Sequence, residues 1–200
     1  MKKLWIVPTL LIAIATSNVS FADETIVMVR HGEKPAAGLG QLNCQGLHRS
    51  LALPRVLQQK FGAPAAIFAP NPGIQKEDRG TPYNYIRPLA TIEPTAIALE
   101  LPVNTQFGLE DIDGLQQAVI TSHYANATVF VAWEHRLVEE FARRILSSNH
   151  GDPALVPVWK SDDFDSIYIV TLRTDKNGNR TASFALDKEN LNDLPTTCRE

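Results

Sequence analysis

A short run of apolar, mostly β-branched residues that ends in a histidine motif constrains this chain more than any other segment. Residues 25–29 read Thr-Ile-Val-Met-Val and are followed at once by Arg30, His31, Gly32 and Glu33. Such a run predicts a buried strand, and a glycine after it lets the backbone turn sharply or approach a ligand closely. We therefore expect a strand whose carboxyl end presents a guanidinium and an imidazole, at the place where open α/β sheets bind ligands.

A second apolar run ends in a similar way later in the chain. Residues 128–133 predict another buried strand, and Glu134, His135 and Arg136 follow it. In a parallel sheet both strand ends meet at one edge, so we expect His31 and His135 to share a site. One imidazole can attack phosphorus, while the other imidazole and nearby arginines stabilise charge on the equatorial oxygens.

The rest of the chain alternates strands and helices. Further strands are predicted at 65–69 and 166–172, helices at 46–61, 88–101, 112–122 and 137–146, a short extended piece at 102–107, and a hairpin turn at 175–179 before a return strand at 181–186. The proline-rich segment 70–82 is expected to be a loop, and the longer irregular stretch 70–86 is expected to border a site. This order predicts an α/β fold, a three-layer α/β/α sandwich with a mainly parallel central sheet.

The first 22 residues have the pattern of a secretory signal peptide. Two lysines precede an apolar stretch over residues 4–15, and Ser20 and Ala22 place small residues at the −3 and −1 positions of a cleavage site. The stretch is shorter than the ~20 residues of a membrane span, although an uncleaved anchor is the alternative. We expect cleavage after Ala22, a bacterial periplasmic or secreted protein without stable membrane insertion, and a single domain over residues 23–200.

The charge balance argues against nucleic acid or an anionic membrane as a partner. The chain has 19 basic and 22 acidic residues and a net charge of −3, and residues 1–22 contribute two lysines and no acid. A binding site for anions must therefore be a local cluster of arginines. We expect the partner to be a small phosphorylated substrate or phosphate, and the sequence leaves the oligomeric state open.

Cys44 and Cys198 are the only cysteines. In an oxidising compartment such a pair predicts one disulfide that fastens the carboxyl terminus, with two unpaired thiols as the alternative. Neither cysteine has neighbours that would activate it as a nucleophile.

Several of these motifs together resemble the histidine phosphatase superfamily, whose fold is phosphoglycerate mutase-like. The resemblance runs through residues 29–33, Leu42–Leu47, Pro88-Leu89 with Thr95-Ala96, and Trp133-Glu134-His135. These segments occur in the family's order and spread over most of residues 25–172, so the set is far more specific than any single motif.

The resemblance implies a phosphomonoester hydrolase that needs no metal or cofactor. His31 would be the nucleophile that becomes phosphohistidine, and Arg30 and His135 would line the phosphate pocket. The family's further arginine usually lies where this chain has Thr91. Arg87 lies four residues earlier, about one helical turn, and is expected to point the same way. If Arg87 is a loop arginine instead, the pocket lacks one cation.

Hydrolysis also needs a carboxyl group that protonates the leaving oxygen and then activates water. Glu134 is the first candidate because it neighbours His135, and Glu33, Glu93 and Glu110 are its rivals. One branch of the superfamily, which includes phytases, places an aspartate directly after its second histidine. Arg136 occupies that place here, so the chain fits this branch poorly.

Three other interpretations are weighed against an enzyme of this kind. The chain could be a catalytically inactive phosphate-binding or phospho-ligand-binding protein of the cell envelope, or a purely structural envelope protein. A metal site formed by His31, His135 and Glu134 has suitable ligand types, but it lacks a compact ligand spacing and is flanked by Arg30 and Arg136. We therefore predict no metal.

Overall fold

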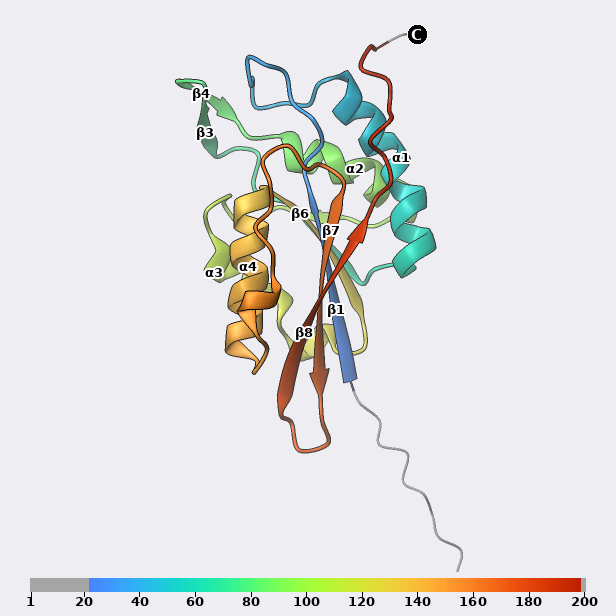
Figure 1. Ribbon diagram of the computed structural model, residues 1–200, viewed down its shortest axis with the longest axis vertical. Coiled ribbons are helices and arrows are strands. Elements are labelled where there is room, and N and C mark those ends of the chain that lie inside the picture. The colour runs from blue at the N-terminus through green and yellow to red at the C-terminus, as the bar shows by residue number, and fades with distance from the viewer. Residues whose placement is uncertain (1–21, 199–200) are drawn as a thin grey trace, which may run out of the picture.

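A six-stranded mixed sheet between helices forms the centre of the computed structural model, which describes residues 22–198 (Figure 1). The strands of this sheet are β1 (Ala22–Arg30), β2 (Ala66–Phe68), β5 (Val103–Asn104), β6 (Thr128–Trp133), β7 (Ser166–Thr174) and β8 (Arg180–Lys188). The helices are α1 (Cys44–Phe61), α2 (Arg87–Leu99), α3 (Ile112–Val119) and α4 (His135–Ser148). A separate hairpin consists of β3 (Gln75–Asp78) and β4 (Thr81–Asn84), and 3-10 turns cover Ser122–Tyr124 and Pro153–Leu155.

The strand order β5-β2-β6-β1-β7-β8 places the two strands that end in histidine motifs side by side. Strands β5, β2, β6 and β1 run parallel, whereas β7 is antiparallel to β1 and β8 is antiparallel to β7. Arg30 is the register partner of Trp133, and the backbone N–H of His31 donates to Trp133 O at 3.0 Å. The carboxyl ends of β1 and β6 therefore lie next to each other, as the sequence predicted.

Two apolar clusters attach helices to opposite faces of the sheet. Ile26 and Met28 of β1 belong to the cluster that contains the buried faces of α3 and α4, and Val27 and Val29 belong to the cluster that contains those of α1 and α2. This division follows from the period of two in a strand. A strand buried on both faces is near-continuously apolar, which is the pattern of residues 25–29. The predicted three-layer sandwich with a mainly parallel sheet is confirmed (Figure 1).

Most differences from the predicted elements occur at element ends, where capping residues determine at which residue a helix begins. Asn43 caps α1 by accepting from the Gly46 N–H at 2.9 Å, so this helix begins at Cys44. Glu134 caps α4 in the same way, and that helix begins at His135. Helix α2 begins at Arg87, with a proline in its first turn.

The prediction of an irregular loop over residues 70–82 was wrong for most of that segment. Strands β3 and β4 form a hairpin there that pairs with no other strand among the described residues. Its residues are polar and mostly exposed, so they leave no alternating apolar pattern from which a strand could be predicted. In Figure 1 the hairpin projects beyond the end of the main sheet where the carboxyl ends of β1 and β6 lie.

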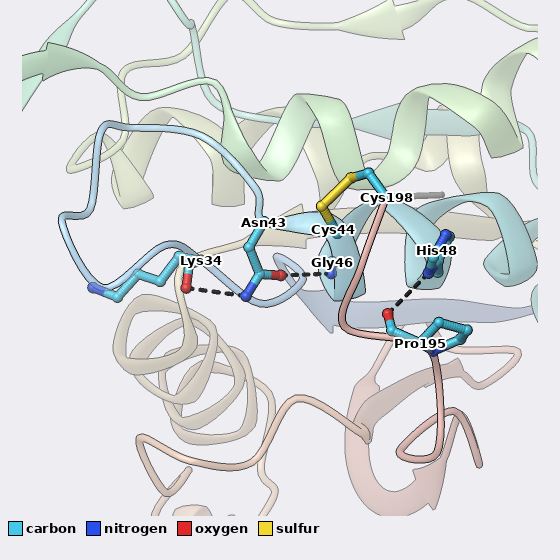
Figure 2. The surroundings of a disulfide bond; sticks show 7 residues. All are labelled: Lys34, Asn43, Cys44, Gly46, His48, Pro195 and Cys198. Atoms are coloured by element: carbon cyan, nitrogen blue, oxygen red, sulfur yellow. Dashed lines mark hydrogen bonds between the residues drawn. A yellow bond between two sulfur atoms is a disulfide. The ribbon is translucent and has the colours of Figure 1, made fainter. Parts of the chain in front are cut away.

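The predicted disulfide between Cys44 and Cys198 is confirmed (Figure 2). It joins the first residue of α1 to the carboxyl-terminal segment, which runs along this helix after β8. The same segment is held by His48, whose Nδ1 donates to Pro195 O at 2.9 Å, and by Arg49, whose Nη2 donates to Leu191 O at 3.1 Å.

The predicted signal peptide lies outside the described residues except for Ala22, which begins β1. Among residues 22–198, no helix is both long enough and apolar enough to span a bilayer.

Candidate active site

The ends of β1 and β6, the start of α2 and the β3–β4 hairpin together line one cavity of about 370 Å³. Its walls include all five residues that the sequence placed in a phosphate site, namely Arg30, His31, Arg87, Glu134 and His135. Other surface cavities exist, including one of about 490 Å³ between α3 and α4. That cavity contains no histidine, so it lacks the nucleophile that the sequence predicts.

His31 is buried and its ring orientation is fixed. Its Nδ1 lies 2.8 Å from Gly32 O. Because a carbonyl only accepts, Nδ1 carries the proton of the neutral ring, and Nε2 keeps its lone pair. Burial lowers the pKa of His31 to about 3, and the charges of Arg30 and Arg87 add to this effect. The ring is therefore neutral at physiological pH, with one nitrogen available as a nucleophile.

Arg30 is held by its surroundings rather than by a carboxylate. Its Nη1 donates to Ser161 O at 2.9 Å and to Asp163 O at 2.8 Å, and its guanidinium lies 3.8 Å from the centroid of Phe164. Its buried Nε has no hydrogen-bond partner among the described residues. Burial lowers the pKa of Arg30 to about 10, so the side chain stays charged at neutral pH and offers donors to an anion.

Arg87 is the first residue of α2, and it reaches the same cavity. Its Nη1 donates to Asp78 Oδ2 at 2.6 Å, and its guanidinium lies 4.6 Å from the centroid of Tyr85. Arg87 thus lies in the cavity that contains His31, although it precedes Thr91 by about one helical turn. Its buried Nε is also without a partner in the described part of the chain.

Thr91 occupies the position where the histidine phosphatase superfamily usually has an arginine, and its side chain makes different contacts. Its Oγ1 accepts from the Gly32 N–H at 2.9 Å and donates to Arg87 O at 2.8 Å. The hydroxyl therefore connects the loop after His31 to the first turn of α2, which carries Arg87.

Glu134 and His135 act as a pair at the start of α4. His135 Nδ1 lies 2.7 Å from Glu134 Oε1, while Glu134 Oε2 accepts from the backbone N–H groups of Arg136 and Leu137 at 3.1 and 3.3 Å. Burial alone would raise the pKa of Glu134, but the His135 imidazole and nearby cations outweigh it and lower the pKa to about 2. Glu134 is thus an ionised cap of the helix whose carboxylate lies against the His135 imidazole.

The rivals of Glu134 lie in other settings. Glu33 faces Arg49, whose Nη2 donates to Glu33 Oε1 at 2.7 Å, in a buried ion-pair cluster that also includes Glu189. Glu93 is exposed on α2. Glu110 has a side chain that is 73% exposed, and its Oε1 lies 3.7 Å from Lys76 Nζ. None of these three lines the cavity that contains His31.

Seven further residues line the cavity that were not among the predicted site residues, namely Lys34, Lys76, Glu77, Asp78, Tyr85, Arg136 and Ser161. Three of them, Lys76, Glu77 and Asp78, come from the hairpin that was not predicted, and only the fold brings them to His31. Tyr85 is buried, and its ring packs edge-on to His31 with centroids 5.9 Å apart. Lys76 Nζ lies 5.4 Å from the centroid of the same tyrosine ring.

The first turn of α1 touches the loop after His31 with backbone alone. A Cβ on Gly46 would lie 2.4 Å from Glu33 O, and a Cβ on Gly32 would lie 2.9 Å from Gly46 Cα. Contacts this short exclude any side chain at Gly46, because the atoms it would meet are backbone. The two glycines therefore allow the helix and the loop after His31 to pack directly together.

No cluster of three or more His, Cys, Asp or Glu side chains that could hold a metal ion occurs among residues 22–198. In the cavity, five guanidinium or ammonium groups (Arg30, Lys34, Lys76, Arg87 and Arg136) outnumber three carboxylates (Glu77, Asp78 and Glu134) around two imidazoles. Such a set favours an anion with several oxygen atoms over a cation.

This chain is similar to known proteins in its fold, whereas its sequence matches none of the families or curated proteins compared. No protein-family model matches the sequence, and no curated protein matches it either. Among solved structures, a Nakamurella multipartitia protein named phosphohistidine phosphatase SixA has a TM-score of 0.56 and 13% identity, over 85% of this chain and 98% of its own.

Two further structures agree with this comparison. Phosphoglycerate mutase from Plasmodium falciparum has a TM-score of 0.53 and 13% identity, over 90% of this chain and 98% of its own. Mycobacterial glucosyl-3-phosphoglycerate phosphatase in complex with inorganic phosphate has a TM-score of 0.52 and 13% identity, over 81% and 95% of the two chains. The chain therefore has the phosphoglycerate mutase-like fold that its sequence predicted.

Proposed function

We propose that this protein is a phosphomonoester hydrolase of the histidine phosphatase superfamily that works without a metal, through a phosphohistidine on His31. The observation that carries the proposal is the fixed tautomer of His31. The bond from Nδ1 to Gly32 O leaves Nε2 unprotonated inside a cavity lined by Arg30 and Arg87. A neutral, buried imidazole between two guanidinium groups is suited to attack a phosphate group rather than to bind a cation.

The other residues stabilise charge on the transferred group. Arg30 and Arg87 each have a buried Nε without a partner in the described chain, and these donors suit equatorial phosphate oxygens. His135 is held by Glu134 at the start of α4, where the helix N-terminus also favours an anion. Attack by Nε2 releases the alcohol and forms phosphohistidine, and water then releases phosphate and restores the imidazole.

The experiment that tests this function uses p-nitrophenyl phosphate and the mature protein in the presence of EDTA. Wild type is expected to turn over and to form an acid-labile phosphoenzyme, whereas His31→Ala is expected to do neither. His123→Ala, which removes an exposed imidazole away from the cavity, is the matched control. Turnover by His31→Ala near the wild-type rate would contradict the proposal, and turnover by wild type that EDTA abolishes would contradict the absence of a metal.

One observation favours a second candidate, a phosphate-binding protein of the cell envelope without turnover. Arg87 is already paired with Asp78 in a buried ion pair, so the cavity holds an internal anion. Saturable binding of inorganic phosphate or vanadate in calorimetry, with no phosphoenzyme from any substrate, would identify this candidate. The partner proposed for this site is in either case a small phosphorylated molecule or phosphate.

We also propose that the chain is exported and cleaved after Ala22, as its first residues suggest. The disulfide between Cys44 and Cys198 supports an oxidising compartment. Sequencing the amino terminus of the protein recovered from a periplasmic extract tests this, and a start at Asp23 is expected. Recovery of the full-length chain from the cytoplasm would contradict it.

A further inference from the structure

We propose that Asp78 is the general acid and base of this site, the residue that donates a proton to the leaving oxygen and later takes one from water. The inference rests on the proposed phosphatase function and goes beyond it, because no sequence motif points to Asp78. It replaces Glu134, the candidate that the sequence favoured for this role.

Asp78 is a buried carboxylate in the same cavity as His31. It ends β3, and its exposed fraction is 7%. Its Oδ2 lies 2.6 Å from Arg87 Nη1, and its Oδ1 lies 3.6 Å from Lys34 Nζ. The carboxylate therefore contacts the guanidinium that is proposed to hold the phosphate.

The neighbouring loop is shaped around this carboxylate. Gly38 has φ of +82°, and a Cβ built on it would lie 2.3 Å from Asp78 Cγ. Position 38 thus has a backbone conformation that favours glycine, and the Asp78 carboxyl group fills the space that a side chain there would need. The backbone of Gly40 also donates a hydrogen bond to it. Such a fit distinguishes the buried Asp78 from Glu77, the exposed neighbour that also lines the cavity.

Position in the fold separates Asp78 from Glu134. Glu134 follows β6 directly, beside the strand end that carries His31, and lines the cavity from the main sheet. Asp78 comes from the hairpin that projects beyond the end of the sheet (Figure 1). In-line attack by His31 directs the leaving oxygen away from the strand end, toward the side on which the hairpin lies.

Asp78 and Glu134 also differ in the groups that keep their carboxylates ionised. Two backbone N–H groups of α4 donate to Glu134, and these donors remain whether or not a ligand is bound. Asp78 is kept ionised by Arg87 and Lys34, which lower its pKa against the effect of burial. A bound phosphate takes a share of those two cations and adds negative charge nearby, and both effects favour a protonated Asp78.

The two chemical steps balance with this one proton. In the first, His31 Nε2 bonds to phosphorus, the bond from phosphorus to the ester oxygen breaks, and the Asp78 carboxyl proton moves to that oxygen. The alcohol leaves, and Asp78 becomes a carboxylate. In the second, water attacks phosphorus, its proton moves to Asp78, the P–N bond breaks, and phosphate leaves neutral His31 behind.

The test compares substrates that differ in their need for a proton. p-Nitrophenolate leaves without protonation, whereas the alkoxide of β-glycerophosphate does not. Asp78→Asn keeps the shape of the side chain, Glu134→Gln tests the rival carboxylate, and Glu93→Gln, which removes an exposed carboxylate outside the cavity, is the control. The readouts are the rate of phosphoenzyme formation in rapid-quench experiments and the steady-state turnover of each substrate, with thermal unfolding as a check of folding.

We expect Asp78→Asn to slow phosphoenzyme formation from β-glycerophosphate by about 10²–10⁴-fold, to leave its formation from p-nitrophenyl phosphate near wild type, and to make phosphohistidine accumulate. Formate is expected to restore hydrolysis of the phosphoenzyme in Asp78→Ala, which serves as the second variant if the asparagine variant fails to fold. Glu93→Gln should behave as wild type.

Three results would overturn the assignment. An equal loss on both substrates with a raised KM and no rescue by formate would show that Asp78 only positions Arg87. Dependence on the leaving group in Glu134→Gln instead would assign the role to Glu134. A wild-type protein that forms no phosphoenzyme from either substrate would overturn the proposed function itself, and that result is distinct from the other two.

Discussion

The backbone N–H of Gly32 donates a 2.9 Å hydrogen bond to Thr91 Oγ1, and the same hydroxyl donates to Arg87 O at 2.8 Å. One buried hydroxyl thus connects the residue after the proposed nucleophile with the backbone of the proposed phosphate ligand. Thr91 is fully buried, so neither backbone group can exchange this partner for water.

Replacing Thr91 by valine keeps the shape of the side chain and removes the hydroxyl. We expect Thr91→Val to lower the free energy of unfolding by about 1–3 kcal/mol, because the buried Gly32 N–H loses its acceptor. Turnover should also fall, since the loop that orients His31 loses a fixed contact. Urea unfolding and steady-state kinetics measure the two effects. Thr91→Ser keeps the hydroxyl and should stay close to wild type in both, and equal effects from the two variants would contradict this role.

His31 should remain neutral far below the pH at which an ordinary histidine takes up a proton. Its pKa is lowered to about 3, mainly by burial, against about 6.5 for a free imidazole. Nitrogen chemical shifts of ¹⁵N-histidine-labelled protein are expected to show the Nδ1-protonated tautomer from pH 8 down to about pH 4.5. The exposed His123 gives a reference signal in the same spectra. A midpoint near pH 6.5 for His31 would contradict the buried, carbonyl-bound placement of its ring.

The sequence predicted those site residues whose roles depend on their neighbours along the chain, and it missed those whose roles depend on contacts with distant segments. Strand β6 was predicted with its observed bounds, and β1 with its carboxyl end, because a buried strand leaves a continuous apolar run in its own residues. Arg30, His31 and His135 followed from those strand ends. Arg87 and Thr91 could be placed only by counting along a helix.

Other roles depend on contacts between distant segments and leave no local trace. Asp78 is an unremarkable acid in a polar stretch until the hairpin brings it to Arg87 and Lys34. Trp133 could be assigned neither to the core nor to the pocket wall from the sequence. It is fully buried in the cluster under α4, and its Nε1 donates to Leu109 O at 2.8 Å.

Glu24 should make stability depend on pH in the opposite direction from a paired acid. It is buried in β1, its Oε1 has no partner in the described part of the chain, and burial raises its pKa to about 7 despite the charge of Arg180. A folded-state pKa above the unfolded value of about 4.5 means that the folded form holds the proton more tightly. The contribution of Glu24 is therefore favourable below about pH 4.5 and is lost as pH rises to about 7.

Glu24→Gln removes this dependence. We expect the variant to be more stable than wild type by about 1–3 kcal/mol at pH 8, a range discounted for partial access to solvent, and to match it near pH 4.5. Urea unfolding at both values measures the difference. Glu93→Gln, in which the lost carboxylate is exposed, is the control. A glutamine variant less stable than wild type at pH 8 would mean that the Glu24 carboxylate is paired.

The disulfide should stabilise the folded protein because it closes a long loop of the chain. Cys44 and Cys198 are 154 residues apart, and bridges over long loops typically stabilise by 2–4 kcal/mol. We expect dithiothreitol to lower the melting temperature of wild type and to leave that of Cys44→Ser/Cys198→Ser unchanged at a similarly low value. The reductant should act only slowly if the contacts of His48 and Arg49 hold the segment in place. An equal response of both proteins would contradict the bridge.

The bare backbone contact between Gly46 and Glu33 also limits how this protein can vary. Any residue larger than glycine at position 46 must push the start of α1 away from the loop that follows His31. A substitution there should therefore displace the proposed nucleophile, although Gly46 itself does not line the cavity. In a deep mutational scan, position 46 should tolerate as little as a catalytic position does. Sequence changes in the first turn of α1 therefore require compensating changes in the loop that follows His31.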